Sequence, residues 1–137
     1  MGDASVETQA TKFRLEEEHL DGGTIMLTVR GDTDLHSADQ LEDRLSEAID
    51  GGAPAIVIDL SAVTFLDSMA LGVLVAGMKR CRAMDGRFRL VAPRSEIRRV
   101  FELTLLDRVF ELDETRSEAL AATAPGSGST RGRGLGS

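Results

Sequence analysis

The sequence predicts an α/β sandwich, in which a mixed, mostly parallel β-sheet has helices packed on it. Segments with strand and helix patterns alternate along 137 residues, a length that suits one domain. Residues 54–60, PAIVIDL, form a continuous apolar run, which is typical of a central parallel strand covered on both faces. An Asp-Gly-Gly turn between two apolar segments adds an antiparallel hairpin at the start.

Composition and charge exclude several classes of function. The chain has 42% hydrophobic residues, one cysteine, two histidines and a formal net charge of -7. One cysteine and two distant histidines provide no structural zinc site, and we expect no cofactor. The acidic balance and the absence of Trp and Tyr argue against a nucleic-acid partner. No apolar run reaches the roughly 18 residues of a membrane span, so we expect no membrane partner.

The folded domain is predicted to span residues 11–122. Residues 1–10 lack periodic apolar positions, which predicts a flexible leader. Residues 123–137, TAPGSGSTRGRGLGS, predict a disordered Gly/Ser/Arg tail, since little in them could be buried. The N-terminus has no apolar segment of the secretory kind, so we expect a cytoplasmic protein.

The first elements are predicted to be a hairpin and a helix. Apolar residues on both sides of Asp21-Gly22-Gly23 predict two antiparallel strands, the second at 24–29. Ser37 and Gln40 have the spacing of a capping box, so a helix is expected to begin at Ser37. Its apolar stripe recurs every three or four positions: Leu41, Leu45, Ala48 and Ile49.

The second half continues the alternation. Residues 69–78 carry no charge, so the first half of the helix that they form is predicted to be buried. The alternating segment 87–91 predicts a strand that presents Arg87 and Arg89 to solvent. Three elements complete the domain: a helix at 95–104, a short strand at 109–112 and a terminal helix at 115–122.

The sequence lacks the residue patterns of two kinds of catalytic site. Ser68 follows Asp67, but neither histidine lies in a triad setting and no Gly-x-Ser-x-Gly turn is present. A magnesium-dependent phospho-acceptor domain needs a lysine after its last strand, and the chain has only Lys12 and Lys79. Four carboxylates that such a domain would place near strand ends are nevertheless present: Asp32, Asp34, Asp59 and Asp67. We therefore expect a protein that is not an enzyme.

Ser68 is the most informative residue. It opens a predicted helix, where free backbone N–H groups and the helix dipole would tolerate a phosphate. Phosphorylation would add about 1.5 to 2 negative charges beside Asp67. The residues leave two interpretations open: Ser68 is a regulatory phosphorylation site, or Asp67 or Ser68 only caps the helix, a contribution on the order of 1 kcal/mol.

Residues 56–74 strongly resemble the signature of the STAS-domain anti-sigma-factor antagonists. The matching positions at the family spacing are Asp59-Leu60-Ser61, Val63, Phe65, Asp67-Ser68 and Leu71-Gly72. Gly31-Asp32-Thr33-Asp34, with Ser37 after it, resembles the family's Gly-Glu-Leu-Asp loop. The resemblance covers about residues 13–120 and implies a STAS-like sandwich.

The resemblance also implies a function and partners. In this family the serine after the Asp, here Ser68, is phosphorylated by an anti-sigma factor that is also an ATP-dependent serine kinase. The unphosphorylated form binds this kinase and releases the sigma factor, and a PP2C-type phosphatase restores that form. The family's partner-binding surface maps here to Asp34, Ser37, Asp67, Met69 and Leu71. We expect a monomer or weak dimer.

Three departures from the family pattern leave an alternative open. Met69 and Ala70 replace the usual Ser-Gly, and Thr33 replaces an aliphatic residue. A methyl at Ala70 and a flexible apolar side chain at Met69 change the contact surface. The alternative is a STAS scaffold or small-ligand-sensing subunit of a transport or stress-signalling assembly, in which Ser68 is not phosphorylated.

Overall fold

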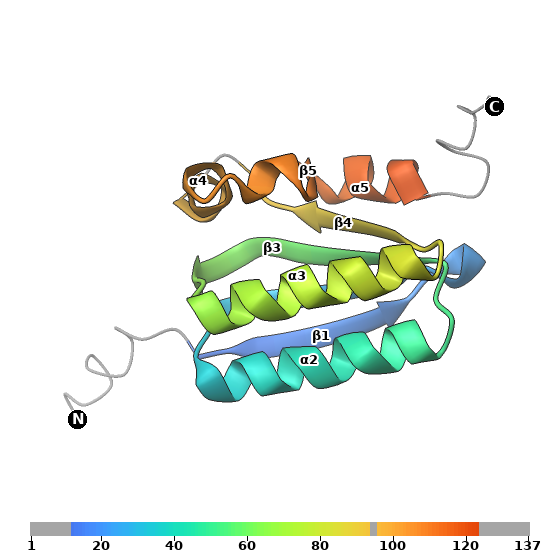
Figure 1. Ribbon diagram of the computed structural model, residues 1–137, viewed down its shortest axis with the longest axis horizontal. Helices are drawn as coiled ribbons and strands as arrows, with labels where there is room; N and C mark the ends of the chain where they lie inside the picture. The colour runs from blue at the N-terminus through green and yellow to red at the C-terminus, as the bar shows by residue number, and fades with distance from the viewer. Residues whose placement is uncertain (1–11, 94–95, 124–137) are drawn as a thin grey trace.

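A five-stranded sheet with helices on both faces forms the described part of the chain (Figure 1). This computed structural model describes residues 12–93 and 96–123. The predicted leader, residues 1–10, lies outside the described residues. The predicted tail also lies outside them, except for its first residue, Thr123. Within those residues, no helix has the length and apolar character needed to cross a membrane.

Strands and helices alternate as the sequence predicts. The elements are β1 (Arg14–His19), η1 (Asp21–Gly23), β2 (Ile25–Asp32), α2 (Leu35–Asp50), β3 (Ala55–Phe65), α3 (Ser68–Ala83), β4 (Arg87–Val91), α4 (Glu96–Leu103), η2 (Leu106–Arg108), β5 (Glu111–Asp113) and α5 (Arg116–Thr123). The strands lie side by side in chain order. β1 is antiparallel to β2, and every other neighbouring pair is parallel. The predicted mixed, mostly parallel sheet is confirmed.

The predicted hairpin joins β1 to β2 through a turn rich in glycine. The Leu20 N–H donates to the Thr24 carbonyl at 2.8 Å, and the Gly23 N–H donates to the Leu20 carbonyl at 3.2 Å. Gly22 and Gly23 have φ angles of 79° and 87°, in the left-handed region that glycine adopts without a steric penalty.

The two faces of the sheet bury cores of different size. Ile56, Ile58 and Leu60 of β3 face the larger core, which α2, α3 and α4 cover. Val57 faces a smaller core beneath Ala119 of α5. β3 is thus covered on both faces, as its apolar run predicts. In Figure 1, α2 and α3 lie side by side across one face of the sheet.

Close packing holds α3 against α2. A Cβ added at Gly77 would lie 2.9 Å from Cδ1 of Leu45, so the missing side chain lets the two helices approach. At the surface, the Arg80 guanidinium donates to Ser46 Oγ and to Asp50 Oδ1, each at 2.9 Å. These contacts set the position of α3 and of the residues at its beginning.

Charged residues lie beneath α5, contrary to the expectation that Arg89 faces solvent. The Arg89 guanidinium donates twice to Asp113, at 2.6 and 2.9 Å, and is half-buried. This pairing raises the pKa of Arg89. Asp59 is buried on the same face, 3.4 Å from Arg116. The expectation fails because α5 covers the face of β4 that alternation alone assigns to solvent.

Candidate functional site

The predicted site residues meet at one edge of the sheet. β2 and β3 are parallel neighbours, and their last paired residues are Asp32 and Phe65. Because carboxyl ends of adjacent parallel strands lie at the same edge, the loops that follow them also meet there. One loop leads into α2 and the other into α3, so the predicted site residues of both helices gather at this edge.

The beginning of α2 differs from the predicted one. Asp34, not Ser37, is the N-cap, so the helix begins at Leu35. The Ser37 N–H donates to the Asp34 carboxylate at 2.8 Å, and the Asp34 N–H donates to Ser37 Oγ at 2.6 Å. A capping box is therefore present, but it lies three residues before the Ser37–Gln40 box that the spacing suggested. Ser37 is buried within it, while Asp34 is exposed.

The beginning of α3 presents Ser68 to solvent. Asp67 is the N-cap, and its carboxylate accepts a hydrogen bond from the Ala70 N–H at 2.9 Å. Ser68 is the first helical residue and is exposed. Of the two candidate caps, Asp67 caps the helix, and the fold does not use the Ser68 hydroxyl for that purpose.

Thr33 links the two loops, a contact that the sequence analysis missed. Its hydroxyl donates to Asp67 Oδ1 at 3.1 Å and accepts from the Asp67 N–H at 2.9 Å. Its own N–H donates to the Phe65 carbonyl at 2.9 Å. Thr33 is only 3% exposed. One feature of the sequence could have pointed to this contact. Thr33 has a hydroxyl at a position where the family that the sequence resembles has an aliphatic residue.

Three large apolar side chains are exposed at the edge that carries Ser68. Leu35, Phe65 and Met69 are 62%, 54% and 51% exposed. The prediction that the first half of α3 is buried is therefore wrong for its outer side. Only one stripe of the helix, which includes Ala70, is buried against the core. Leu71, predicted to contact the partner, is half-buried and packs against the core.

A pocket that is lined by Phe65 and by polar side chains lies at the same edge. It has a volume of 580 Å³ and is lined by Lys12, Phe13, Asp32, Thr33, Asp34, His36, Ser37, Gln40 and Phe65. Asp32 accepts a hydrogen bond from the Thr64 hydroxyl. Asp59 does not belong to this group, because it lies beneath α5. Among residues 12–93 and 96–123, no three His, Cys, Asp or Glu side chains are grouped to hold a metal ion.

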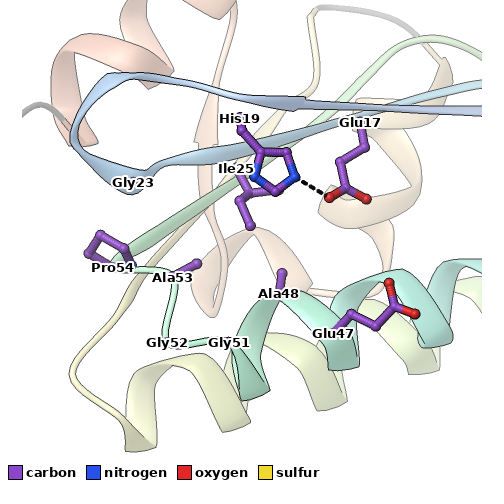
Figure 2. A pocket seen from close by; sticks show the side chains of 10 residues that line it. All are labelled: Glu17, His19, Gly23, Ile25, Glu47, Ala48, Gly51, Gly52, Ala53 and Pro54. Atoms are coloured by element: carbon purple, nitrogen blue, oxygen red, sulfur yellow. Dashed lines mark hydrogen bonds and ion pairs between the residues drawn. The ribbon is translucent and has the colours of Figure 1, made fainter.

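A second pocket lies at the other end of β3 and contains none of the predicted site residues. Figure 2 shows it between the hairpin and the end of α2. Its volume is 410 Å³. Glu17 and His19 point toward each other across a 2.6 Å contact. The two pockets lie at opposite ends of β3, since Pro54 lines one and Phe65 lines the other. The edge that carries Ser68 is therefore the candidate site.

Protonation of Asp34 is expected to reduce the stability of the fold. The Ser37 amide N–H, aided by the Ser37 hydroxyl, holds the pKa of the Asp34 carboxyl below its ordinary value. A lowered pKa in the folded state gives stability that is present above the unfolded pKa and is lost as pH falls through the folded pKa. Asp34→Asn removes the charge of this side chain but keeps an oxygen that can cap the helix. Urea unfolding should show this variant less stable than the wild type at pH 7.

The difference between Asp34→Asn and the wild type should shrink as pH falls below about 4, where an unperturbed aspartate takes up its proton. The same difference at every pH from 7 to 2 would show that the charge of Asp34 contributes no stability.

Comparisons with known proteins support the family that the sequence resembles. Residues 17–119 match the family described as STAS domain. The chain is 36% identical over 104 residues to the anti-sigma-F factor antagonist RsfB of Mycobacterium tuberculosis, a match that covers 76% of this chain and 84% of RsfB. The crystal structure of an anti-sigma factor antagonist from Mycobacterium paratuberculosis superposes with a TM-score of 0.75 at 36% identity, covering 82% of this chain and 94% of that one.

Structures of the anti-sigma factor antagonist SpoIIAA are similar to this chain in two chemical states. The unphosphorylated form has a TM-score of 0.68 and the phosphorylated Bacillus form 0.64, both at 27% identity. Each match covers 78% of this chain, and they cover 93% and 96% of the two SpoIIAA chains. These similarities confirm the predicted STAS-like sandwich.

Proposed function

The chain belongs to the STAS domain family, and from that membership we propose that it is an anti-sigma-factor antagonist switched by phosphate on Ser68. The unphosphorylated form binds a kinase-type anti-sigma factor and releases the sigma factor, and phosphorylation ends the binding. One observation carries the proposal. Ser68 is exposed at the first turn of α3, next to apolar and acidic side chains that lie at the same edge. The names of RsfB and SpoIIAA support the same class of function.

The beginning of α3 supports phosphorylation without loss of the fold. Asp67 provides the cap, so a group added to the Ser68 hydroxyl removes no capping bond. The first turn of a helix has free N–H groups and the positive end of the dipole, which favour a negative group. Ser68 is exposed, so a kinase can reach its hydroxyl without local unfolding.

The surface around Ser68 supports partner binding that is sensitive to charge. Leu35, Phe65 and Met69 offer apolar area that is in contact with water in the free chain. Burying such area in an interface is favourable by about 25 cal/mol per Å². A phosphate beside Asp67 would place two negative groups together in the buried interface, and juxtaposed like charges there cost several kcal/mol. One modification can therefore reverse the binding equilibrium.

The remaining parts of the proposal concern partners and setting. The kinase is an ATP-dependent anti-sigma factor, and a PP2C-type phosphatase removes the phosphate from Ser68. The chain is a substrate and binder without catalytic activity, a monomer or weak dimer, and acts in the cytoplasm through a domain at residues 11–122. The existence of SpoIIAA in unphosphorylated and phosphorylated forms supports such a cycle.

A competition assay tests the proposal. The full chain would be titrated into a complex of the kinase-type anti-sigma factor and sigma factor encoded in the same genome. We expect the unphosphorylated chain to displace the sigma factor, measured by size-exclusion chromatography. The chain treated with the kinase and ATP should displace none. No binding in either state would favour the alternative, a scaffold or ligand-sensing subunit.

A further inference from the structure

Thr33 makes a three-bond connection between the loops that precede α2 and α3. Its hydroxyl is at once a donor to the Asp67 carboxylate and an acceptor from the Asp67 N–H. Its backbone N–H donates to the Phe65 carbonyl. Because Thr33 is 3% exposed, water does not compete for these bonds. One residue thus restrains the backbone that leads directly to Ser68.

Thr33 is next to the N-cap of α2 in the chain and is hydrogen-bonded to the N-cap of α3. Asp34, the next residue, is the cap of α2, and Ser68 directly follows Asp67, the cap of α3. Asp67 Oδ1 accepts from both the Thr33 hydroxyl and the Ala70 N–H. The Thr33 hydroxyl therefore orients the same carboxylate oxygen that orders the first turn under Ser68.

We propose that Thr33 is a positioning residue for phosphoryl transfer to Ser68. The inference rests on the proposed function, since it concerns the same site. The hydroxyl holds Asp67, and Asp67 holds the first turn of α3, so the backbone that carries Ser68 is held in one position. A kinase gains rate from such preorganisation, because misplacement of a nucleophile by about 1 Å can lower the rate by as much as 100-fold.

The Thr33 hydroxyl makes both side-chain bonds through one oxygen atom. Threonine and serine provide one O–H donor and lone pairs that accept. Valine has nearly the same shape but leaves the Asp67 N–H without its acceptor, and an unpaired buried donor is costly. Thr33→Val should therefore loosen the segment before Ser68 while the core keeps its volume, and Thr33→Ser should restore the connection.

A kinetic comparison of three variants tests this role. Ile49→Val is the matched control, since it removes one methyl from a buried residue at the far end of α2. The assay measures initial rates of phosphate incorporation by the anti-sigma kinase encoded in the same genome. For Thr33→Val we expect kcat to fall about tenfold, with KM changed by less than about threefold. Thr33→Ser and Ile49→Val should stay within about twofold of the wild type.

Amide hydrogen exchange in the free chain gives an independent readout. The N–H groups of Asp67 and Ala70 should exchange faster in Thr33→Val, and Thr33→Ser and Ile49→Val should leave them near the wild-type rates. Wild-type kcat in Thr33→Val, or a loss equal to that of Ile49→Val, would overturn the role of Thr33 while the proposed function stands. A wild-type chain that takes up no phosphate would overturn the proposed function and this role with it.

Discussion

Replacing Ser68 with aspartate is expected to weaken binding to the anti-sigma factor by about 100-fold, or about 3 kcal/mol. The new carboxylate would lie beside Asp67, and an interface there would desolvate two negative groups. The fold should remain intact, because a negative side chain in the first turn of a helix is stabilising by about 0.3 to 1 kcal/mol. Isothermal titration calorimetry would measure the affinity, and thermal unfolding would measure the fold.

Ser68→Asn is the matched control, because asparagine has the shape of aspartate without its charge. We expect Ser68→Asn and Ser68→Ala to bind within about fivefold of the wild type, as neutral groups bring no repulsion. Equal affinities for Ser68→Asp and Ser68→Asn would show that charge at this position does not control binding. Unfolding of all three variants would instead assign Ser68 a structural role.

Leu74→Ala is expected to lower the free energy of unfolding by about 3 kcal/mol, within the range of about 2 to 5 kcal/mol for buried leucines. Leu74 lies on the buried stripe of α3 in the larger core and is fully buried. Its removal leaves a cavity beneath the helix that carries Ser68. Urea denaturation at neutral pH would measure the loss.

Leu103→Ala makes the same chemical change at an exposed position. Leu103 is the last residue of α4 and is 71% exposed, so we expect a change below about 0.5 kcal/mol. A similar loss for both variants would contradict the position of α3 on the core. If Leu74→Ala lowers the free energy of unfolding only slightly, the contacts that stabilise α3 do not involve Leu74.

Local patterns predicted most of the elements. The apolar run of β3 and the glycine turn of the hairpin are signals within a few residues, and both elements are present. The start of α2 was ambiguous, because Asp34 and Ser37 each have a partner at capping distance three residues later. The structure uses Asp34, with extended backbone at that residue, and buries Ser37 inside the helix.

The remaining differences come from contacts between distant segments. α5 covers a face of β4, which leaves Arg89 only partly exposed although alternation predicts full exposure. The outer side of α3 has an apolar sequence but little cover, which leaves Met69 exposed. Thr33 and Asp67 are 34 positions apart, so no local pattern predicts their hydrogen bonds. A partner-binding surface has this property in general, since its apolar residues resemble core residues in the sequence.

Peptide mass spectrometry of the chain purified from its native cells tests the central claim most directly. The measurement asks whether a phosphate is attached to Ser68 under growth and under stress. The proposed switch predicts phosphate on Ser68 in at least one of these conditions, in a fraction of the molecules that changes between them. Unmodified Ser68 in both conditions, with the Ser68 peptide fully observed, would contradict the switch.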